Sequence, residues 1–107
     1  MRMQESGSDQ ETPFTVKVGQ KKVWAYVTAC VTYFNKGGNR LVIRARGDNI
    51  PKAIDAANAL RRSFYKDLAV GVISLVEDQV EDERGPRAVT AIEIPLSLEP
   101  MSSEGSE

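Results

Sequence analysis

The sequence predicts an α/β protein of the α+β two-layer type, in which one mixed four-stranded sheet carries two helices on one face. Stretches with alternating apolar and polar residues, typical of strands, are interleaved with two stretches whose apolar residues recur every three or four positions, as in helices. The resulting order is β-α-β-α-β-β, and its last two strands predict a long β-hairpin arm. The 107 residues suffice for one such domain with its own core.

The first half of the chain contains two predicted strands with a helix between them. Residues 14–18 alternate between apolar and polar side chains and predict a short strand. From residue 22 to about residue 35 the apolar positions follow the helical period, and the Gly-rich turn at residues 36–39 predicts the helix end. Residues 40–46 form the second predicted strand, whose successive side chains point to opposite faces.

The second half of the chain contains a helix followed by a hairpin. Asp-Asn-Ile-Pro at residues 48–51 is typical of a helix start, and an apolar stripe continues from there to residue 68. The nearly continuous apolar run at residues 70–76 predicts a buried strand, which more polar residues extend to residue 80. A charged Gly-Pro turn at residues 81–87 and an alternating strand at residues 88–98 complete the hairpin.

Both ends of the sequence predict disorder. Residues 1–13 are polar and lack apolar periodicity, and residues 99–107 form an acidic tail rich in Ser and Glu. The polar start is not typical of a secretory signal, and no apolar run approaches the roughly 18 residues that span a bilayer. We therefore expect one domain, residues 14–98, in a cytoplasmic protein without a membrane partner.

The composition excludes most catalytic and metal-binding chemistry. The chain has no His and a single Cys, which rules out His-based acid–base pairs, Ser-His-Asp triads, His-ligated zinc and an intrachain disulfide. Cys30 lies on the apolar stripe of the first predicted helix and is expected to be a buried, unreactive thiol. We therefore expect no enzyme activity, no metal and no cofactor.

The charges are distributed unevenly, although the formal net charge is only −1. Residues 14–68 carry eleven Lys or Arg and three Asp, whereas residues 69–107 carry two Arg and nine Asp or Glu. The local field, rather than the total charge, decides whether a polyanion binds. The basic part of the domain is therefore a candidate surface for nucleic acid, and scattered solvated charge is the alternative.

Several basic residues occur where the backbone also favours anions. Lys21 and Lys22 lie where a strand leads into a helix, and Arg46 is followed by the start of the second helix, so helix N-terminal N–H groups are close to both. Both helices follow strands of the same direction, so both N-termini are expected at one end of the sheet. Two arginines at the hairpin tip predict a second contact point. The candidate nucleic-acid-binding residues are Lys17, Lys21, Lys22, Arg44, Arg46, Asn49, Lys52, Arg84 and Arg87.

Four segments of the sequence resemble the Alba family of small archaeal chromatin proteins, which has eukaryotic relatives among ribonuclease P subunits and RNA-binding proteins. The segments are VGQKKVWAYV at residues 18–27, VIRARGDNIPKAID at residues 42–55, RRSF at residues 61–64 and VTAIEI at residues 89–94. The resemblance covers about residues 16–98, and the second segment is its most specific part. It implies an obligate dimer that binds duplex DNA, and often RNA, largely without sequence preference.

The resemblance also implies the contact residues. It assigns nucleic-acid contacts to the lysine pair before the first helix, to Arg46, and to hairpin arms that reach into minor grooves. Phe64 matches a family position at the contact between dimers. The last strand presents Ile92 and Ile94, more apolar surface than one two-layer body obviously covers. These three residues and Arg61 are the expected dimer or dimer–dimer interface.

The sequence departs from the family pattern at two positions near the basic site. Gln20 stands where the family commonly has the first of two lysines, the one that is acetylated. Asp48 stands where a basic residue is common in the family. Both changes lower the positive charge, and they indicate a divergent paralogue that binds more weakly or acts partly as a heterodimer partner.

The functional hypothesis is a dimeric, non-enzymatic protein that coats or compacts double-stranded DNA in the nucleoid. A ribonucleoprotein subunit that binds structured RNA is an open alternative, because A-form and B-form duplexes both offer phosphates. A protein–protein scaffold is the alternative from another class. The sequence also leaves open whether the partner is a second copy or a paralogue, and whether Lys21 or Lys22 is acetylated.

Overall fold

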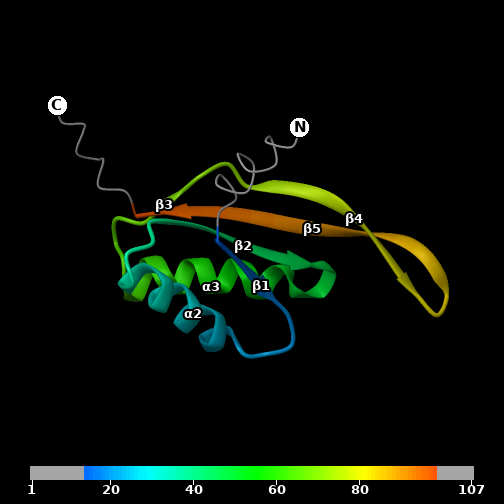
Figure 1. Ribbon diagram of the computed structural model, residues 1–107, viewed down its shortest axis with the longest axis horizontal. Helices are drawn as coiled ribbons and strands as arrows, with labels where there is room; N and C mark the ends of the chain where they lie inside the picture. Colours follow the sequence, from blue (N-terminus) through cyan, green and yellow to red (C-terminus); the bar gives the residue numbers. More distant parts are fainter. Residues whose placement is uncertain (1–13, 99–107) are drawn as a thin grey trace, which may run out of the picture.

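One mixed sheet carries two helices on one of its faces (Figure 1). This computed structural model describes residues 14–98, and the two segments predicted to be disordered, 1–13 and 99–107, lie outside the described residues. The predicted α+β two-layer class is confirmed, with five strands in place of four. The elements are β1 (Phe14–Val18), α2 (Val23–Asn35), β2 (Arg40–Arg46), the 3-10 turn η1 (Gly47–Asn49), α3 (Ile50–Ser63), β3 (Ala69–Val70), β4 (Ser74–Asp82) and β5 (Gly85–Ser97).

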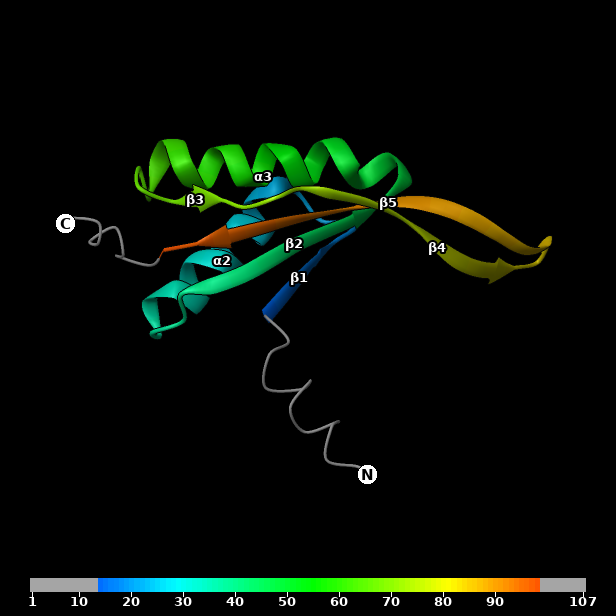
Figure 2. The ribbon, with the colours of Figure 1, turned by 90° about the horizontal axis from the view of Figure 1, so that it is seen from above.

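The strand directions bring the starts of both helices together. The sheet order is β1-β2-β5-β3, and β4 also pairs with β5 (Figure 2). β1 and β2 are parallel, with Val18 opposite Ala45, whereas β5 is antiparallel to β2, with Glu93 opposite Arg44. Each parallel strand leads within a few residues into a helix, so the first turns of α2 and α3 lie at the same end of the sheet, as predicted.

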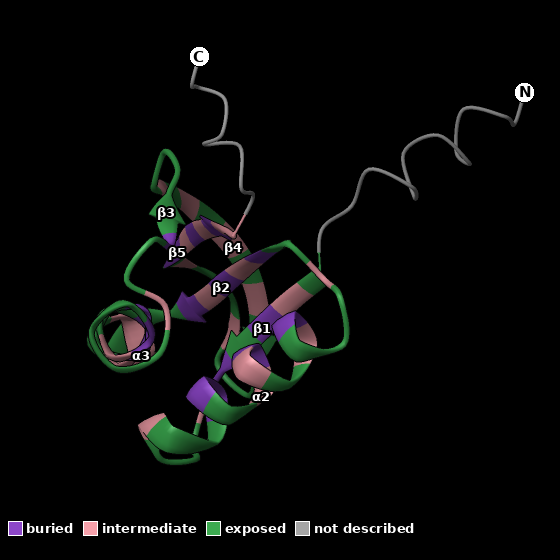
Figure 3. Ribbon diagram, turned by 90° about the vertical axis from the view of Figure 1, so that its left-hand side faces the viewer, coloured by how far each residue is buried: buried purple, intermediate pink, exposed green. Residues whose placement is uncertain are grey.

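The core fills the space between the helices and the sheet. Figure 3 shows the buried segments of α2, α3 and the central strands turned toward one another. Val27 and Cys30 of α2, Leu60 of α3, and Ile43 and Leu96 of the sheet are all less than 2% exposed. These residues are the alternate strand positions and the helical stripes of the sequence pattern, so burial of the predicted apolar faces accounts for the two-layer packing.

Helix α3 ends earlier than the apolar stripe predicts. It ends at Ser63, where the N–H groups of Phe64 and Tyr65 both donate to the carbonyl of Leu60, at 3.0 and 2.8 Å. A single chain buries the apolar stripe of α3 only in part: Phe64 and Ile54 are 48% and 42% exposed.

The prediction of a single buried strand at residues 70–76 is wrong. The segment forms two pieces on the same edge of β5: Val70 of β3 lies opposite Leu96, and β4 starts with Ser74 opposite Glu93. The chain advances four residues between these pairs while β5 advances three, so one extra residue interrupts the ladder, as in a β-bulge. The apolar run therefore lies on an edge, and its exposed large side chains are Val70, Val72, Ile73 and Leu75.

β4 and β5 form the predicted hairpin arm, whose outer half projects beyond the two-layer body (Figure 1). Pairing continues to Asp82 opposite Gly85, so the turn consists of Glu83 and Arg84 and is shorter than the predicted turn at residues 81–87. Gly85 has a φ of +103°, a backbone conformation that favours glycine. The arm is therefore a two-stranded ribbon up to its tip.

The burial of Cys30 predicts that its thiol is unreactive in the folded protein. Burial raises the pKa of the Cys30 thiol to about 12, so roughly one molecule in ten thousand carries the thiolate at pH 8. We expect a thiol-specific chromogenic reagent to label no Cys in native buffer and one Cys per chain in denaturant. Stoichiometric labelling of the native protein within minutes would contradict the burial of this residue.

Candidate functional site

The loop between β1 and α2 is held from two sides. The hydroxyl of Tyr26 accepts the N–H groups of Gly19 and Lys21, at 2.8 and 3.0 Å. The ammonium of Lys52, from the first turn of α3, donates to the carbonyls of the same two residues, at 2.8 and 2.7 Å. These four hydrogen bonds tie α2, α3 and the loop together, so Lys21 and Lys22 project from a fixed backbone.

The four bonds assign roles that the sequence did not reveal. Two of the three N–H donors of the Lys52 ammonium are engaged with loop carbonyls, so Lys52 supports the loop, and its contact with nucleic acid stays a prediction. Burial acts to raise the pKa of the Tyr26 phenol, but the two backbone N–H donors and the Lys52 charge outweigh it, and the pKa lies below the ordinary value. The spacing in the sequence could have indicated that Tyr26 faces the core, because it lies four residues, about one helical turn, before the buried Cys30.

Basic side chains gather where β1 and β2 end. An open hollow of about 330 Å³ is lined by Lys17 and Val18 of β1, by Arg44, Ala45 and Arg46 of β2, and by Asn49. Lys21 and Lys22 lie on the loop at this same end of the sheet and do not line the hollow. We call Lys17, Lys21, Lys22, Arg46 and Asn49 together the basic end. Of the residues expected to converge, Arg46 and Asn49 line the hollow, and Lys21 and Lys22 lie on the loop at the same end of the sheet.

The helix starts at the basic end add donors for an anion. Lys22 is the N-cap residue of α2, and its side chain makes no capping hydrogen bond. The start of α3 offers fewer donors, because the N–H of Ile50 donates to the carbonyl of Gly47 and Pro51 has no N–H. N–H groups of a first helical turn that lack a side-chain cap are favourable partners for an anion, and the helix dipole adds partial positive charge. The basic end therefore combines side-chain cations with oriented backbone donors.

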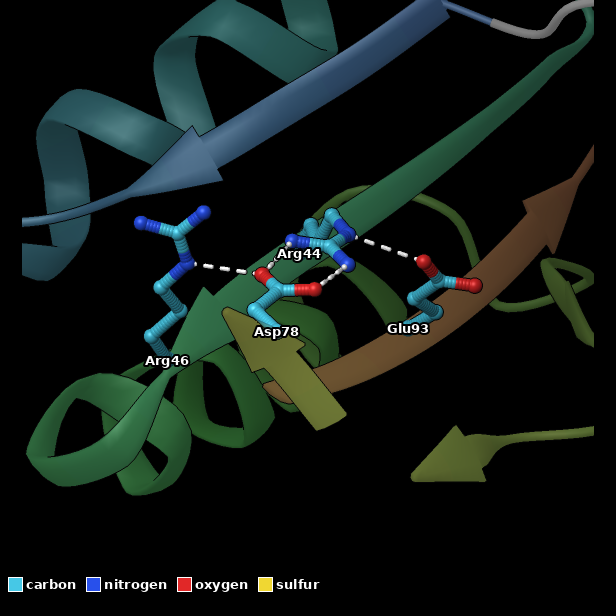
Figure 4. A network of polar contacts seen from close by, with 4 residues as sticks. All are labelled: Arg44, Arg46, Asp78 and Glu93. Carbon is cyan, nitrogen blue, oxygen red and sulfur yellow. Dashed lines mark hydrogen bonds and ion pairs between the residues drawn. The ribbon is translucent and has the colours of Figure 1, made fainter. Parts of the chain in front are cut away.

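Arg44 is held by two carboxylates on the sheet face opposite the helices (Figure 4). Its Nη1 and Nη2 donate to the two carboxylate oxygens of Asp78 at 2.7 and 2.8 Å, and its Nε donates to Glu93 at 2.8 Å. The bonds to Asp78, then those to Glu93, raise the pKa of Arg44 above its ordinary value. These bonds use three of the five N–H donors of the guanidinium and pair its charge within the chain, so Arg44 is less available to a phosphate than Arg46.

Arg46 keeps donors available at the same place. Its Nε donates to Asp78 at 2.7 Å, and its two terminal nitrogens point away from that carboxylate (Figure 4). The Arg46 side chain is 54% exposed, whereas that of Asp78 is 16% exposed. The bonds from Arg44, then the bond from Arg46, hold the pKa of Asp78 well below its ordinary value. Asp78 lies 34 residues from Arg44, so no local pattern could have revealed the pairing.

The tip of the arm is less basic than its arginines suggest. Arg87 pairs with Asp82 at 3.1 Å, and the backbone N–H of Arg84 donates to the same carboxylate at 2.9 Å. The N–H of Arg84 and then the Arg87 side chain lower the pKa of Asp82. From residue 74 to residue 89 the arm carries five carboxylates and two arginines. Arg84 and Arg87 do lie together at the tip, but in an acidic setting.

The predicted interface residues fall into two groups. Ile92 and Ile94 are 5% and 2% exposed and lie in the core, because they share the β5 face that α3 covers; they form no surface for a partner. Phe64 is exposed at the end of α3, with its ring in edge contact with that of Trp24, 6.1 Å between centroids. Arg61 is also exposed, beside an open hollow that it lines with Asn58, Arg62 and Lys66.

Two further findings concern other kinds of site. Within residues 14–98, no cluster of three or more Cys, Asp or Glu side chains is placed to hold a metal ion. Neither helix in this part of the chain is long and apolar enough to cross a membrane.

Comparison with known proteins identifies similar chains. The family model described as Alba matches residues 15–77. A DNA/RNA-binding protein Alba from Thermoplasma acidophilum is 42% identical over 80 residues, which are 75% of this chain and 90% of the relative. The DNA/RNA-binding protein Alba 1 from Archaeoglobus fulgidus is 41% identical over 83 residues, covering 78% of this chain and 93% of the relative.

Solved structures give the same result for the fold. Alba from Thermoplasma volcanium superposes with a TM-score of 0.75 at 41% identity, covering 78% of this chain and 98% of that one. The crystal structure of ALBA1 from Trypanosoma brucei has a TM-score of 0.61 at 18% identity, covering 81% of this chain and 71% of that one, and shares the fold.

The low pKa of Asp78 predicts how stability depends on pH. A carboxyl group whose pKa is lower in the folded chain than its ordinary value of 3.8 stabilises the fold above that value and loses the contribution as the pH falls toward the folded-state pKa. We expect Asp78→Asn to lower the free energy of unfolding by a constant amount above about pH 5. Below about pH 4, the difference between wild type and variant should become smaller as the pH falls.

Urea unfolding of the two proteins across this pH range measures the difference. Glu77→Gln is the matched control, because it removes the neighbouring carboxylate, which forms no ion pair with a described residue. A difference between wild type and Asp78→Asn that grows on acidification would contradict the ion pairs.

Proposed function

The chain belongs to the Alba family, and from this premise we propose that it binds nucleic acid through the phosphates at its basic end. The observation that carries the proposal is the hollow where Lys17, Arg46 and Asn49 meet, beside the fixed loop of Lys21 and Lys22. Cationic side chains and helix N-terminal N–H groups are the donors that phosphate contacts use, and such contacts supply most sequence-independent affinity.

We propose duplex DNA as the main ligand and RNA as a second one. The name DNA/RNA-binding protein, carried by relatives about 40% identical, supports both polymers. The basic end offers phosphate ligands, and phosphate contacts carry no base sequence. On this basis the protein coats or compacts DNA as a non-enzymatic, chromosome-associated protein of the cytoplasm. If the protein is instead a protein–protein scaffold, its partner proteins should remain bound when the lysines and arginine of the basic end are replaced.

We also propose that the protein is a dimer of two copies. The support is an exposed apolar strip on the edge of the sheet and the neighbouring helix, which we call the apolar edge: Val70, Val72, Ile73 and Leu75 of the β3–β4 segment and Ile54 of α3. Figures 2 and 3 show that α3 and this segment lie along the same side of the molecule. An exposed sheet edge with adjacent apolar side chains is typical of a surface that another chain covers.

Charge at residue 20 is part of the same proposal. Gln20 is exposed on the loop beside Lys21 and is neutral, so the basic end lacks a charge there. Asp48, exposed in the η1 turn before α3, reduces the local field further. Acetylation removes the charge of a lysine, so any control of this kind would act on Lys21 or Lys22.

The phosphate contacts predict a strong salt dependence. With about six phosphates contacted per dimer, the logarithm of the association constant should fall with the logarithm of salt concentration at a slope of roughly −5. Lys21→Ala and Arg46→Ala should each weaken binding by a similar factor on unrelated duplexes, because phosphate contacts are common to all sequences. Fluorescence anisotropy with two labelled duplexes in a salt series measures both effects.

Lys36→Ala is the matched control for this experiment. It removes one exposed charge at the C-cap of α2, the opposite end of the helix from the basic end, so we expect little change in affinity. A slope near zero, or a strong preference for one duplex sequence, would contradict binding through phosphates.

The apolar edge predicts the effect of a charge placed on it. Val72 is 83% exposed in the single chain, so Val72→Asp should leave the fold intact but place a charge in the proposed dimer contact. We expect wild type to sediment as a dimer at micromolar concentration and Val72→Asp as a monomer. Thr28→Asp on the exposed surface of α2 should remain a dimer. A monomeric wild-type protein would refute the proposed dimer.

A further inference from the structure

The carboxylate of Asp78 lies where the chain's own arginines would otherwise meet phosphate. We propose that Asp78 is an affinity-setting residue, an internal competitor that withholds Arg44 and neutralises Arg46 and so limits how tightly the basic end binds nucleic acid. The proposal rests on the function proposed above and adds a restraint built into the same site.

The geometry is that of phosphate recognition with a carboxylate in the phosphate's place. Arginine binds carboxylate and phosphate in the same way, through two parallel N–H···O bonds. Asp78 receives such a pair from Arg44, at 2.7 and 2.8 Å, and a third bond from Arg46. A phosphate can use Arg44 fully only after Asp78 has left it.

The charges of the site lead to the same conclusion. The guanidinium groups of Arg44 and Arg46 face the carboxylates of Asp78 and Glu93, so these four side chains have no net charge together. Of the cationic side chains that line the hollow, Lys17 alone makes no ion pair with a residue of the described chain. Repulsion between the phosphate and the Asp78 carboxylate makes the free energy of binding less favourable. Solvent screens this repulsion incompletely, because the Asp78 side chain is only 16% exposed.

Asp78 also orients Arg46, and this second role opposes the first. The bond from Arg46 Nε to Asp78 leaves the two terminal nitrogens pointing away from the carboxylate (Figure 4). Replacement by Asn separates the two roles, because the amide keeps the size of the side chain and one acceptor oxygen while the charge is lost. Asp78→Asn therefore removes the charge and one of the two bonds from Arg44, while the remaining oxygen can still accept from Arg46.

The position of Asp78 on the arm links this competition to the arm itself. Asp78 belongs to β4, which pairs with β5 and makes no ladder with β2, and its bonds to Arg44 and Arg46 cross to β2. When Arg44 turns to a phosphate, β4 loses the two bonds from Arg44 and keeps the bond from Arg46 and its pairing with β5. Binding at the basic end thus removes two of the three side-chain bonds between Asp78 and β2.

The test compares three full-length proteins on a labelled duplex DNA by fluorescence anisotropy at low and moderate salt. We expect Asp78→Asn to bind about three- to tenfold more tightly than wild type at low salt, and its salt slope to steepen by about one unit as Arg44 gains a phosphate. Glu77→Gln removes the same charge at the adjacent position, which is exposed and unpaired among the described residues, and should change the affinity less than twofold.

A second variant covers the case in which Asp78→Asn does not fold, as judged by circular dichroism. Glu93→Gln removes the charge of the other carboxylate partner of Arg44 and leaves Asp78 unchanged, and should give a smaller gain in the same direction. Affinity of Asp78→Asn equal to that of Glu77→Gln, or lower than wild type, overturns the competitor role.

The outcomes also separate this inference from the proposed function. A wild type that binds the duplex, with no gain in either Asp78→Asn or Glu93→Gln, refutes the inference alone. A wild type that does not bind while Asp78→Asn binds supports the inference in its strongest form. Absence of binding to duplex DNA and to structured RNA by every variant refutes both.

Discussion

The parallel pairing of β1 and β2 is the constraint on which the rest of the site depends. Because both strands run the same way and each leads into a helix, both helix starts and the intervening loop come to one end of the sheet. Lys52 in the first turn of α3 can reach the carbonyls of Gly19 and Lys21 only through this arrangement. The same pairing puts Lys17 opposite Arg44, on adjacent strands.

The sequence predicted the parts of the fold that local patterns determine. The period of the apolar residues identified β1, α2, β2 and the start of α3, because each buries one face against the same core. The prediction for residues 70–76 was wrong, since an apolar run is typical of a buried strand, whereas β3 and β4 pair with β5 on one side and with no described strand on the other. Ile92 and Ile94 were misassigned for the converse reason, because the sequence does not say which face of β5 the helices cover.

The candidate site was predicted in position but not in electrostatics. The approach of Lys17, Arg46 and Asn49 follows from topology, which the sequence order specifies. The partners of Arg44 depend on the register of β2 with β5 and on the path of β4, which no local pattern encodes. As a result, the acidic last third of the sequence partly neutralises the basic two-thirds before it: the charge asymmetry seen along the chain becomes a set of internal ion pairs across one face of the sheet.

The fixed loop between β1 and α2 has a thermodynamic consequence. A flexible basic loop loses backbone freedom when a polyanion orders it, at a cost of about 1–2 kcal/mol for each residue. Here the Tyr26 hydroxyl and the Lys52 ammonium have already ordered Gly19 and Lys21 during folding, so the encounter with a ligand restricts only the lysine side chains. Folding has thus preorganised the loop, so a larger share of the free energy gained from counterion release contributes to affinity.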